Sequence, residues 1–121
     1  MKWKPSPPAL VRAFDAAVQS LRGAEPRKMF GYPAIFVNGN MFAGLVRGKM
    51  VLRLGEKDRE RFLELPRARP FVTMGRRMKE WVVVPPAVLK SESDLKAWLR
   101  KALAHGRSLP AKVAKRTRVR K

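Results

Sequence analysis

Two groups of basic side chains are the residues best suited to chemistry, and that chemistry is the binding of phosphate. The last ten residues hold six lysines and arginines and no acid. Such groups neutralise phosphate oxygens and supply affinity without sequence specificity. We therefore expect a nucleic-acid backbone as the partner of a basic arm, whose cations are Arg107, Lys112, Lys115, Arg116, Arg118, Arg120 and Lys121.

The second group lies between two apolar runs. Arg76, Arg77 and Lys79 follow Gly75, at the turn of an expected β-hairpin. The tip of a β-ribbon can enter a groove of nucleic acid or clamp phosphates. A hairpin tip is also an ordinary place for solvated charge. The alternative is therefore that these cations, like the net charge of +19, serve only solubility.

Residues for catalysis are few. His105 is the only histidine, and it is expected at a helix end as a cap. The nine acids are mixed with bases and supply no evident general acid and base. No cluster has metal-ligand spacing. We therefore predict a protein that is not an enzyme, with no catalytic residue, cofactor, metal ligand or small-molecule substrate.

Length and composition predict one soluble domain. A chain of 121 residues suffices for one domain with its own core. It contains no cysteine, which excludes disulfides and fits a reducing cytoplasm. Its apolar runs fall short of the roughly 18 residues that a membrane-spanning helix needs. We expect a cytoplasmic protein without a membrane partner.

Three segments are expected to be helices: the first and last have the apolar spacing of helices that bury one face, and the middle one is a short, charged surface helix. They cover residues 8–22, 56–65 and 92–105. The first is expected to begin after a Ser6 cap. The last is expected to end at Gly106, because glycine accepts the left-handed conformation that closes a helix.

Apolar residues recur at helical spacing in the last helix, and this apolar stripe places Trp98 beside Leu95 and Leu99. Residues at this spacing lie on one face. We therefore expect Trp98 to be buried. Ser91 or Ser93 precedes the stripe, and either can cap the first N–H groups of the helix.

Residues 29–54 and 71–84 have the apolar runs and turns of antiparallel strands. Asn38-Gly39 between two such runs is a strong hairpin signal, because both residues accept positive φ. A turn at 47–49 adds a third strand, and the runs around Gly75 add a second hairpin. The predicted fold class is α+β, an antiparallel sheet of about five strands with N- and C-terminal helices packed on it.

Aromatic residues stand beside cations at the start of this β region. Phe30 and Tyr32 follow Arg27 and Lys28, a grouping that could stack bases between cationic flanks. The alternative, which we favour, places Phe30 in the core and leaves Tyr32 half-buried.

The residues from Arg27 to Leu45, RKMFGYPAIFVNGNMFAGL, resemble the opening motif of the N-terminal domain of the TfoX/Sxy family. In that motif a basic-Met-Phe-Gly turn leads into a hairpin and a Met-Phe-Ala strand. Residues 75–86 and 95–103 resemble the family's later strand and closing helix. The resemblance covers roughly residues 8–106. It predicts a TfoX N-terminal-like domain over residues 1–106. The run of cations without an apolar pattern predicts a disordered basic arm at 107–121.

The resemblance implies an α+β fold and a link to competence-gene transcription, where the family acts alongside the cyclic-AMP receptor protein. Many members have Gly-Gly where this chain has Gly31-Tyr32. Full regulators also carry a second, helical domain where this chain has a basic arm. We therefore expect a stand-alone N-terminal module.

Together these observations predict a nucleic-acid-associated accessory or transcription-regulatory protein of the TfoX/Sxy type, whose basic arm contacts phosphates. A transcription factor or RNA polymerase is the candidate protein partner. The alternative is a protein–protein adaptor that acts on transcription machinery through the sheet face, with charge serving solubility only. Whether the nucleic acid is DNA or RNA stays open.

Overall fold

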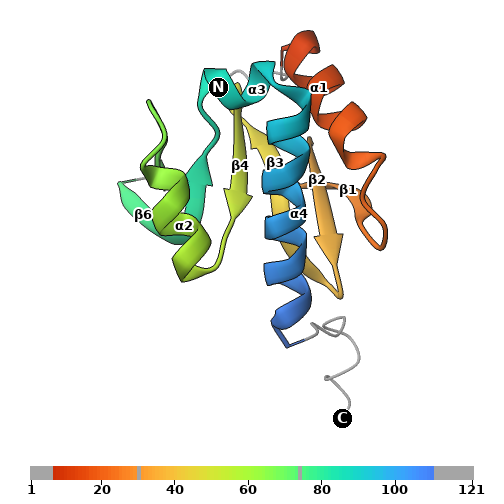
Figure 1. Cartoon of the computed structure of the whole chain (residues 1–121). Coiled ribbons are helices and arrows are strands. Elements are labelled where there is room, and N and C mark those ends of the chain that lie inside the picture. The colour runs from red at the N-terminus through yellow and green to blue at the C-terminus, as the bar shows by residue number, and fades with distance from the viewer. Residues whose placement is uncertain (1–6, 30, 74, 111–121) are drawn as a thin grey trace.

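Helices lie against one face of an antiparallel sheet (Figure 1). The computed structural model describes residues 7–29, 31–73 and 75–110. Its strands are β1 (Glu25–Met29), β2 (Tyr32–Val37), β3 (Asn40–Val46), β4 (Lys49–Arg53), β5 (Arg69–Thr73) and β6 (Arg76–Val83). Its helices are α1 (Pro8–Val18), α2 (Glu56–Leu63), α3 (Pro86–Lys90) and α4 (Glu92–Ser108). The predicted α+β class is confirmed.

The sheet has six strands in the order β1-β2-β3-β4-β6-β5, one more than the five expected. The additional strand is β1, which pairs antiparallel with β2. Its charged sequence lacks the apolar alternation that identifies a strand. It forms because β2 offers an unpaired edge to it. Both edge strands contain a proline, Pro26 and Pro70, and prolines and cations discourage further pairing at an edge.

Two tight turns build the central meander. Asn38 and Gly39 have φ of 53° and 80° between β2 and β3, and Arg47 and Gly48 have φ of 48° and 76° between β3 and β4. Positive φ at both central residues gives the hairpin turn whose twist matches that of the strands. The predicted meander is therefore confirmed.

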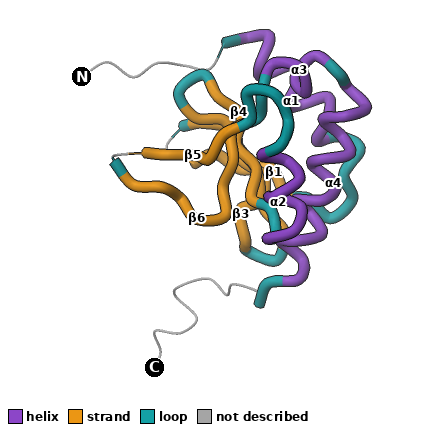
Figure 2. The backbone as a smooth tube through the Cα atoms, turned by 60° about the vertical axis from the view of Figure 1, so that its left-hand side comes forward, coloured by secondary structure: helices purple, strands orange, loops and turns teal. Residues whose placement is uncertain are grey.

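Figure 2 shows the strands on one side and the helices on the other, and the residues of the hydrophobic core come from both layers. Alternate residues of the strands face it, because successive side chains of a strand point to opposite faces. Helix α4 supplies Leu95 and Leu99 on its inner stripe, and α1 and α2 supply Phe14 and Phe62. The strands contribute Ile35, Val37, Phe42, Ala43, Leu45, Met50, Leu52 and Val82 to this core, and Leu54 and Val84 join it just after β4 and β6.

Helix α4 does not end at Gly106, as the sequence predicted, but continues to Ser108. Gly106 is buried against the sheet. A Cβ atom there would lie 2.7 Å from Val37 Cγ1 and 3.4 Å from Phe42 Cβ. The glycine therefore permits close packing of helix on sheet. At the other end, Ser91 Oγ accepts a hydrogen bond from the Asp94 amide at 3.3 Å, so the predicted serine cap is confirmed.

The remaining helix boundaries differ modestly from the predicted ones. Helix α1 ends at Val18, short of residue 22, because the amides of Ser20 and Leu21 bond back to Ala17 and Val18 in tighter turns. The expected Ser6 cap lies outside the described residues. Helix α3 was missed, since we interpreted the proline pair only as the end of a strand. A proline in the first turn also suits a helix start.

Trp98 is half-buried, so the expectation that it is buried was wrong. It lies at the flank of α4 that faces α2, where its ring meets Phe62 edge-on with centroids 4.9 Å apart. Lys101 Nζ lies 5.9 Å from the centroid of the indole. Helix α2 is short and covers this flank only in part, which leaves the indole partly exposed.

Substitution Gly106→Ala should destabilise the protein. In an open helix this change stabilises by roughly 0.5–1 kcal/mol. Here the added methyl meets the buried Val37 side chain, and such overpacking costs about 1–3 kcal/mol. Urea denaturation should show a lowered free energy of unfolding, with Arg100→Ala on the exposed side of α4 as a near-neutral control. An increase in stability would show that α4 does not pack this closely.

Substitution Trp98→Ala should cost about 2 kcal/mol, less than the 3–5 kcal/mol of a fully buried aromatic residue. The loss combines the edge-on contact with Phe62 and the apolar area that is covered. Trp98→Phe should recover most of it. Thermal denaturation measures both variants, and an unchanged melting temperature for Trp98→Ala would contradict this packing.

Candidate nucleic-acid interface

Arg76, Arg77 and Lys79 lie exposed at the start of β6, beside the turn that joins it to β5. Gly75 in this turn has φ of 74°, which suits glycine. Two large apolar side chains are exposed nearby, Val72 at 57% and Met78 at 37%. Within the described part of the chain, none of the three cations makes a hydrogen bond or an ion pair. Their charges are therefore directed at solvent.

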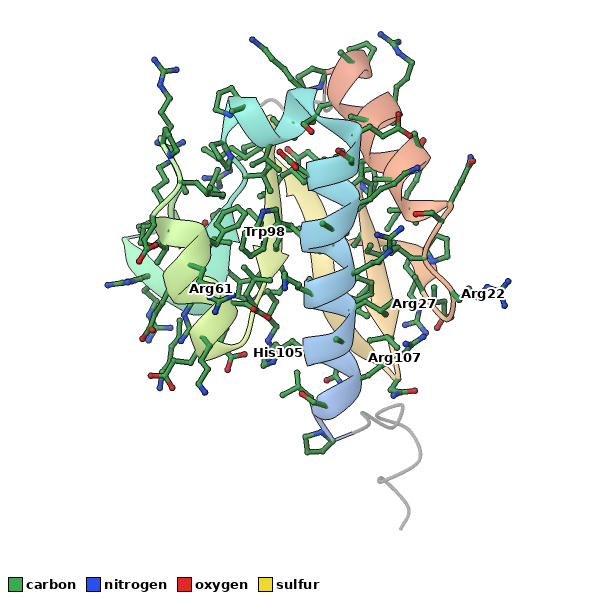
Figure 3. All side chains as sticks on the ribbon, in the orientation of Figure 1. Arg22, Arg27, Arg61, Trp98, His105 and Arg107 are labelled. Atoms are coloured by element: carbon green, nitrogen blue, oxygen red, sulfur yellow. The ribbon has the colours of Figure 1, made fainter. Side chains whose placement is uncertain are left out.

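Arg107 has a structural partner. It lies on the last turn of α4, and its Nη2 donates to the Arg22 carbonyl at 2.6 Å (Figure 3). Gly23 adjoins this contact, and a Cβ atom there would lie 2.7 Å from Arg107 Nη2. The side chain thus ties α4 to the turn after α1. The structure places it in the folded domain and not in an arm, so its binding of phosphate stays a prediction.

The other arm residues, Lys112, Lys115, Arg116, Arg118, Arg120 and Lys121, lie outside the described residues, as does the expected disorder of the arm. The position from which they depart is fixed. Asn40, the one polar side chain among the buried residues of the described chain, donates from Nδ2 to the Pro110 carbonyl at 3.0 Å. The first residue of β3 therefore holds the last described residue of the chain.

The hairpin cations and the departure of the arm lie at the same end of the sheet. Both β3 and β6 run antiparallel to β4, so both begin at one end. Pro110 is bound at the start of β3, and Arg76 opens β6. The pairing of Leu52 with both Ala43 and Val82, and the bond from the Leu54 amide to the Glu80 carbonyl, put Asn40 near the level of Glu80, so the hairpin projects past the point where the arm departs. The two basic groups that the sequence predicted separately thus leave the same end of the sheet.

Near this end, Glu80 links two strands to α4. Its Oε1 accepts from Arg53 Nε at 2.7 Å and lies 3.3 Å from His105 Nε2. Burial alone would raise the pKa of Glu80. The hydrogen bonds and charges of Arg53 and His105 outweigh burial and hold the pKa below its ordinary value.

His105 was expected to be a helix cap, and this was wrong. It lies inside α4, 16% exposed, and its ring packs at Gly55, where a Cβ atom would lie 3.2 Å from Nδ1. Figure 3 shows His105 and Arg107 on opposite sides of the helix. His105 fastens α4 to β6 through Glu80, and Arg107 fastens it to the turn after α1. In the described part of the chain, no three acidic or histidine side chains gather as metal ligands.

Two arginines that sequence reasoning missed lie at the opposite end of β5. Arg67 and Arg69 line a hollow of about 420 Å³, together with Ala68, Val83, Val84, Pro85 and Pro86. They were missed because the strand was expected to begin at Phe71, whereas β5 begins at Arg69. The alternation of charged and apolar residues from 67 to 71 is the signal that could have identified them. Tyr32 is half-buried as expected, and Phe30 lies outside the described residues.

Comparison with known proteins identifies the family. A family model described as the TfoX N-terminal domain matches residues 16–106, and the chain belongs to that family. No curated protein matches the chain. Membership supports, at most, a regulatory function related to competence. None of the helices in the described ranges has the length and apolar character required to cross a bilayer.

The lowered pKa of Glu80 predicts how the stability of a Glu80→Gln variant, relative to wild type, depends on pH. A carboxyl group whose pKa is lower in the folded state stabilises the protein above the unfolded pKa, near 4.5, and loses this contribution as pH falls through the folded pKa. Glu80→Gln should therefore reduce stability at pH 7 by about 1 kcal/mol or less, because solvent screens a pair this exposed. The difference from wild type should shrink towards pH 3.

Urea denaturation at several pH values measures the difference. Glu64→Gln is the control for replacing an acid by an amide, because Glu64 is exposed. A Glu80→Gln difference that grows as pH falls would contradict the assigned contacts with Arg53 and His105.

Proposed function

We propose that this TfoX N-terminal domain protein is a non-enzymatic, cytoplasmic, nucleic-acid-associated regulator that holds phosphates at one end of its sheet. One observation carries the proposal: the exposed cations Arg76, Arg77 and Lys79 lie at the end of the sheet where the chain departs towards six further basic residues. Cations gathered in one region attract a polyanion more strongly than the same charges dispersed over the surface.

The hairpin and the arm would contribute to phosphate binding in different ways. The hairpin fixes its cations on a paired β-ribbon, so they can contact phosphates in a defined geometry. The arm residues add charge and reach, since an extended chain spans about 3.3 Å per residue. The six arm cations have no amide or aromatic neighbours of the kind used for base readout. Specificity would then come from a transcription factor or RNA polymerase bound at the same time.

A protein–protein adaptor is the second candidate. It is favoured by the sheet face that carries no helix in the described residues (Figure 2). In that function the positive charge would serve solubility, and the protein would bind transcription machinery in the absence of nucleic acid. The two candidates differ in whether the isolated protein binds nucleic acid at physiological salt.

Deletion of residues 111–121 tests the proposal. This deletion removes six cations and leaves Arg107 and the bond from Asn40 to Pro110 in place. Each neutralised duplex phosphate contributes about 0.9 to the slope of log affinity against log salt. If four to six cations engage, the slope should flatten by roughly 4–5, about equally for unrelated DNA and RNA sequences. Fluorescence anisotropy at several salt concentrations measures it.

A full-length variant with the six arm cations replaced by glutamine should behave like the deletion, and a shuffled arm of the same composition should behave like wild type. These controls separate charge from chain length and from order. Failure of the intact protein to bind any nucleic acid near 0.15 M salt would exclude the proposed function and favour the adaptor.

A further inference from the structure

The face of the sheet opposite the helices has an apolar layer of its own. Ala34, Phe36, Val51 and Val83 are 1%, 8%, 3% and 6% exposed, respectively, yet none belongs to the core that the helices share. Each alternates with a core residue along its strand, so its side chain points to the opposite face. We call this surface the open face, because the helices of the described chain lie on the other side (Figure 2).

One row of the open face crosses the whole sheet. Five cross-strand pairs join it, so it spans roughly 24 Å at about 4.8 Å per strand. Its four inner residues are small, and an arginine stands on each edge strand. From β1 to β5, the row consists of Arg27, Ala34, Gly44, Val51, Val83 and Arg69.

Larger side chains flank this row. Phe36 pairs with Met41 on one side, and Arg27 Cζ lies 5.0 Å from the centroid of the Phe36 ring. Met41 covers the space above Gly44, where a Cβ atom would lie 2.6 Å from the Met41 methyl group. Trp81, half-buried, shares the open face with Val83 because the two are two residues apart on β6. Methionine is flexible, so this cover can shift for a flat ligand.

Cations surround the aromatic and apolar centre. Arg77 and Lys79 precede Trp81 on β6 and are exposed, so two hairpin cations lie next to the Trp81 end of the open face, beyond a shift in the β5–β6 register. Arg69, Arg77 and Lys79 make no ion pair with any described residue. One acid of this face, Glu25, is bound to Arg27 at 3.0 Å. The surface therefore complements a ligand that combines negative charge with flat rings.

The β5 end of the row adjoins the hollow lined by Arg67, Arg69, Val83 and Pro85. Its volume of about 420 Å³ falls within the range of about 300–1,000 Å³ typical of small-ligand sites. Its lining combines two arginines with apolar side chains. Arg67 has φ of 65°, a conformation that costs energy for a residue other than glycine.

We propose that the open face binds a single-stranded nucleic acid, with bases stacked on Trp81 and beside Met41 and with phosphates on Arg69, Arg77 and Lys79. The proposal rests on the proposed function and names the form of nucleic acid that it requires. Aromatic platforms between cations are the usual means of binding single strands, because every base has a face to stack. In a duplex the base faces are covered, so only the cations could contribute.

The test compares labelled (dT)20, a 20-bp duplex and a 20-residue poly-glutamate peptide as probes of the full-length protein. The double variant Arg69→Glu/Arg77→Glu reverses one charge of the row and one exposed hairpin charge near Trp81 on β6. Arg12→Glu/Arg100→Glu reverses two exposed charges on the helices and is matched in net charge. The first pair should weaken (dT)20 binding about 10-fold or more, and the second less than about 3-fold.

Trp81→Ala tests stacking separately from charge. Loss of one stacked base should weaken (dT)20 binding about 10-fold, leave its salt slope unchanged and spare the binding of duplex and poly-glutamate. Trp81→Phe should restore most of the affinity. If a variant fails to fold, the wild type can be titrated with (dT)20 while amide chemical shifts are recorded. Amides of the row and of the β5–β6 hairpin should then change at lower (dT)20 concentrations than those of α1 and α4.

Different outcomes separate the two proposals. Equal losses in the two charge-reversal variants, tighter binding of duplex than of (dT)20, or poly-glutamate binding with the same dependence on Trp81 would overturn the single-strand proposal and leave the proposed function intact. No binding of either nucleic acid would overturn both. Shifts confined to the helices would also contradict the open face as the site.

Discussion

The contact between α4 and the sheet at Gly106 is the constraint on which the other arrangements depend. Helix and sheet approach closely there because a hydrogen atom stands where any other residue has a side chain against Val37 and Phe42. The contact sets the height of α4 above β2 and β3. It thereby brings His105 to Glu80, Arg107 to the Arg22 carbonyl and Pro110 to Asn40. Three polar contacts at and just beyond the C-terminal end of α4 thus accompany one apolar contact.

Because the helices lie on one face of the sheet, the two faces carry different kinds of residue. The helical side buries the large residues that stabilise the fold. The open face carries small residues at its centre and keeps its cations at the edges. Cations and prolines on β1 and β5 also discourage the addition of another strand. The same residues can thus prevent aggregation and attract a polyanion, and net charge alone does not distinguish these roles.

Local signals in the sequence predicted most of the fold. Asn38-Gly39 specified its hairpin because few other residue pairs accept that backbone, and the stripe of α4 specified which side it buries. The sequence alone could not predict features that depend on tertiary contacts. Strand β1 forms because a partner edge exists. Gly106 looks like a helix end until Val37 is placed beside it. Trp98 shares the apolar stripe, but its burial depends on how far α2 extends over it.

The candidate site was predicted to a smaller extent, for a related reason. Runs of charge are visible along a chain, so the hairpin cations and the arm could be named in advance. That they lie at one end of the sheet follows only from the strand order, in which β3 and β6 run in the same direction on either side of β4. Arg27 and Arg69 are 42 residues apart in the sequence, and they become the two ends of one row only when six strands are in register. A site built across strands is recognised by which residues share a face, and sequence spacing records this only within a single strand.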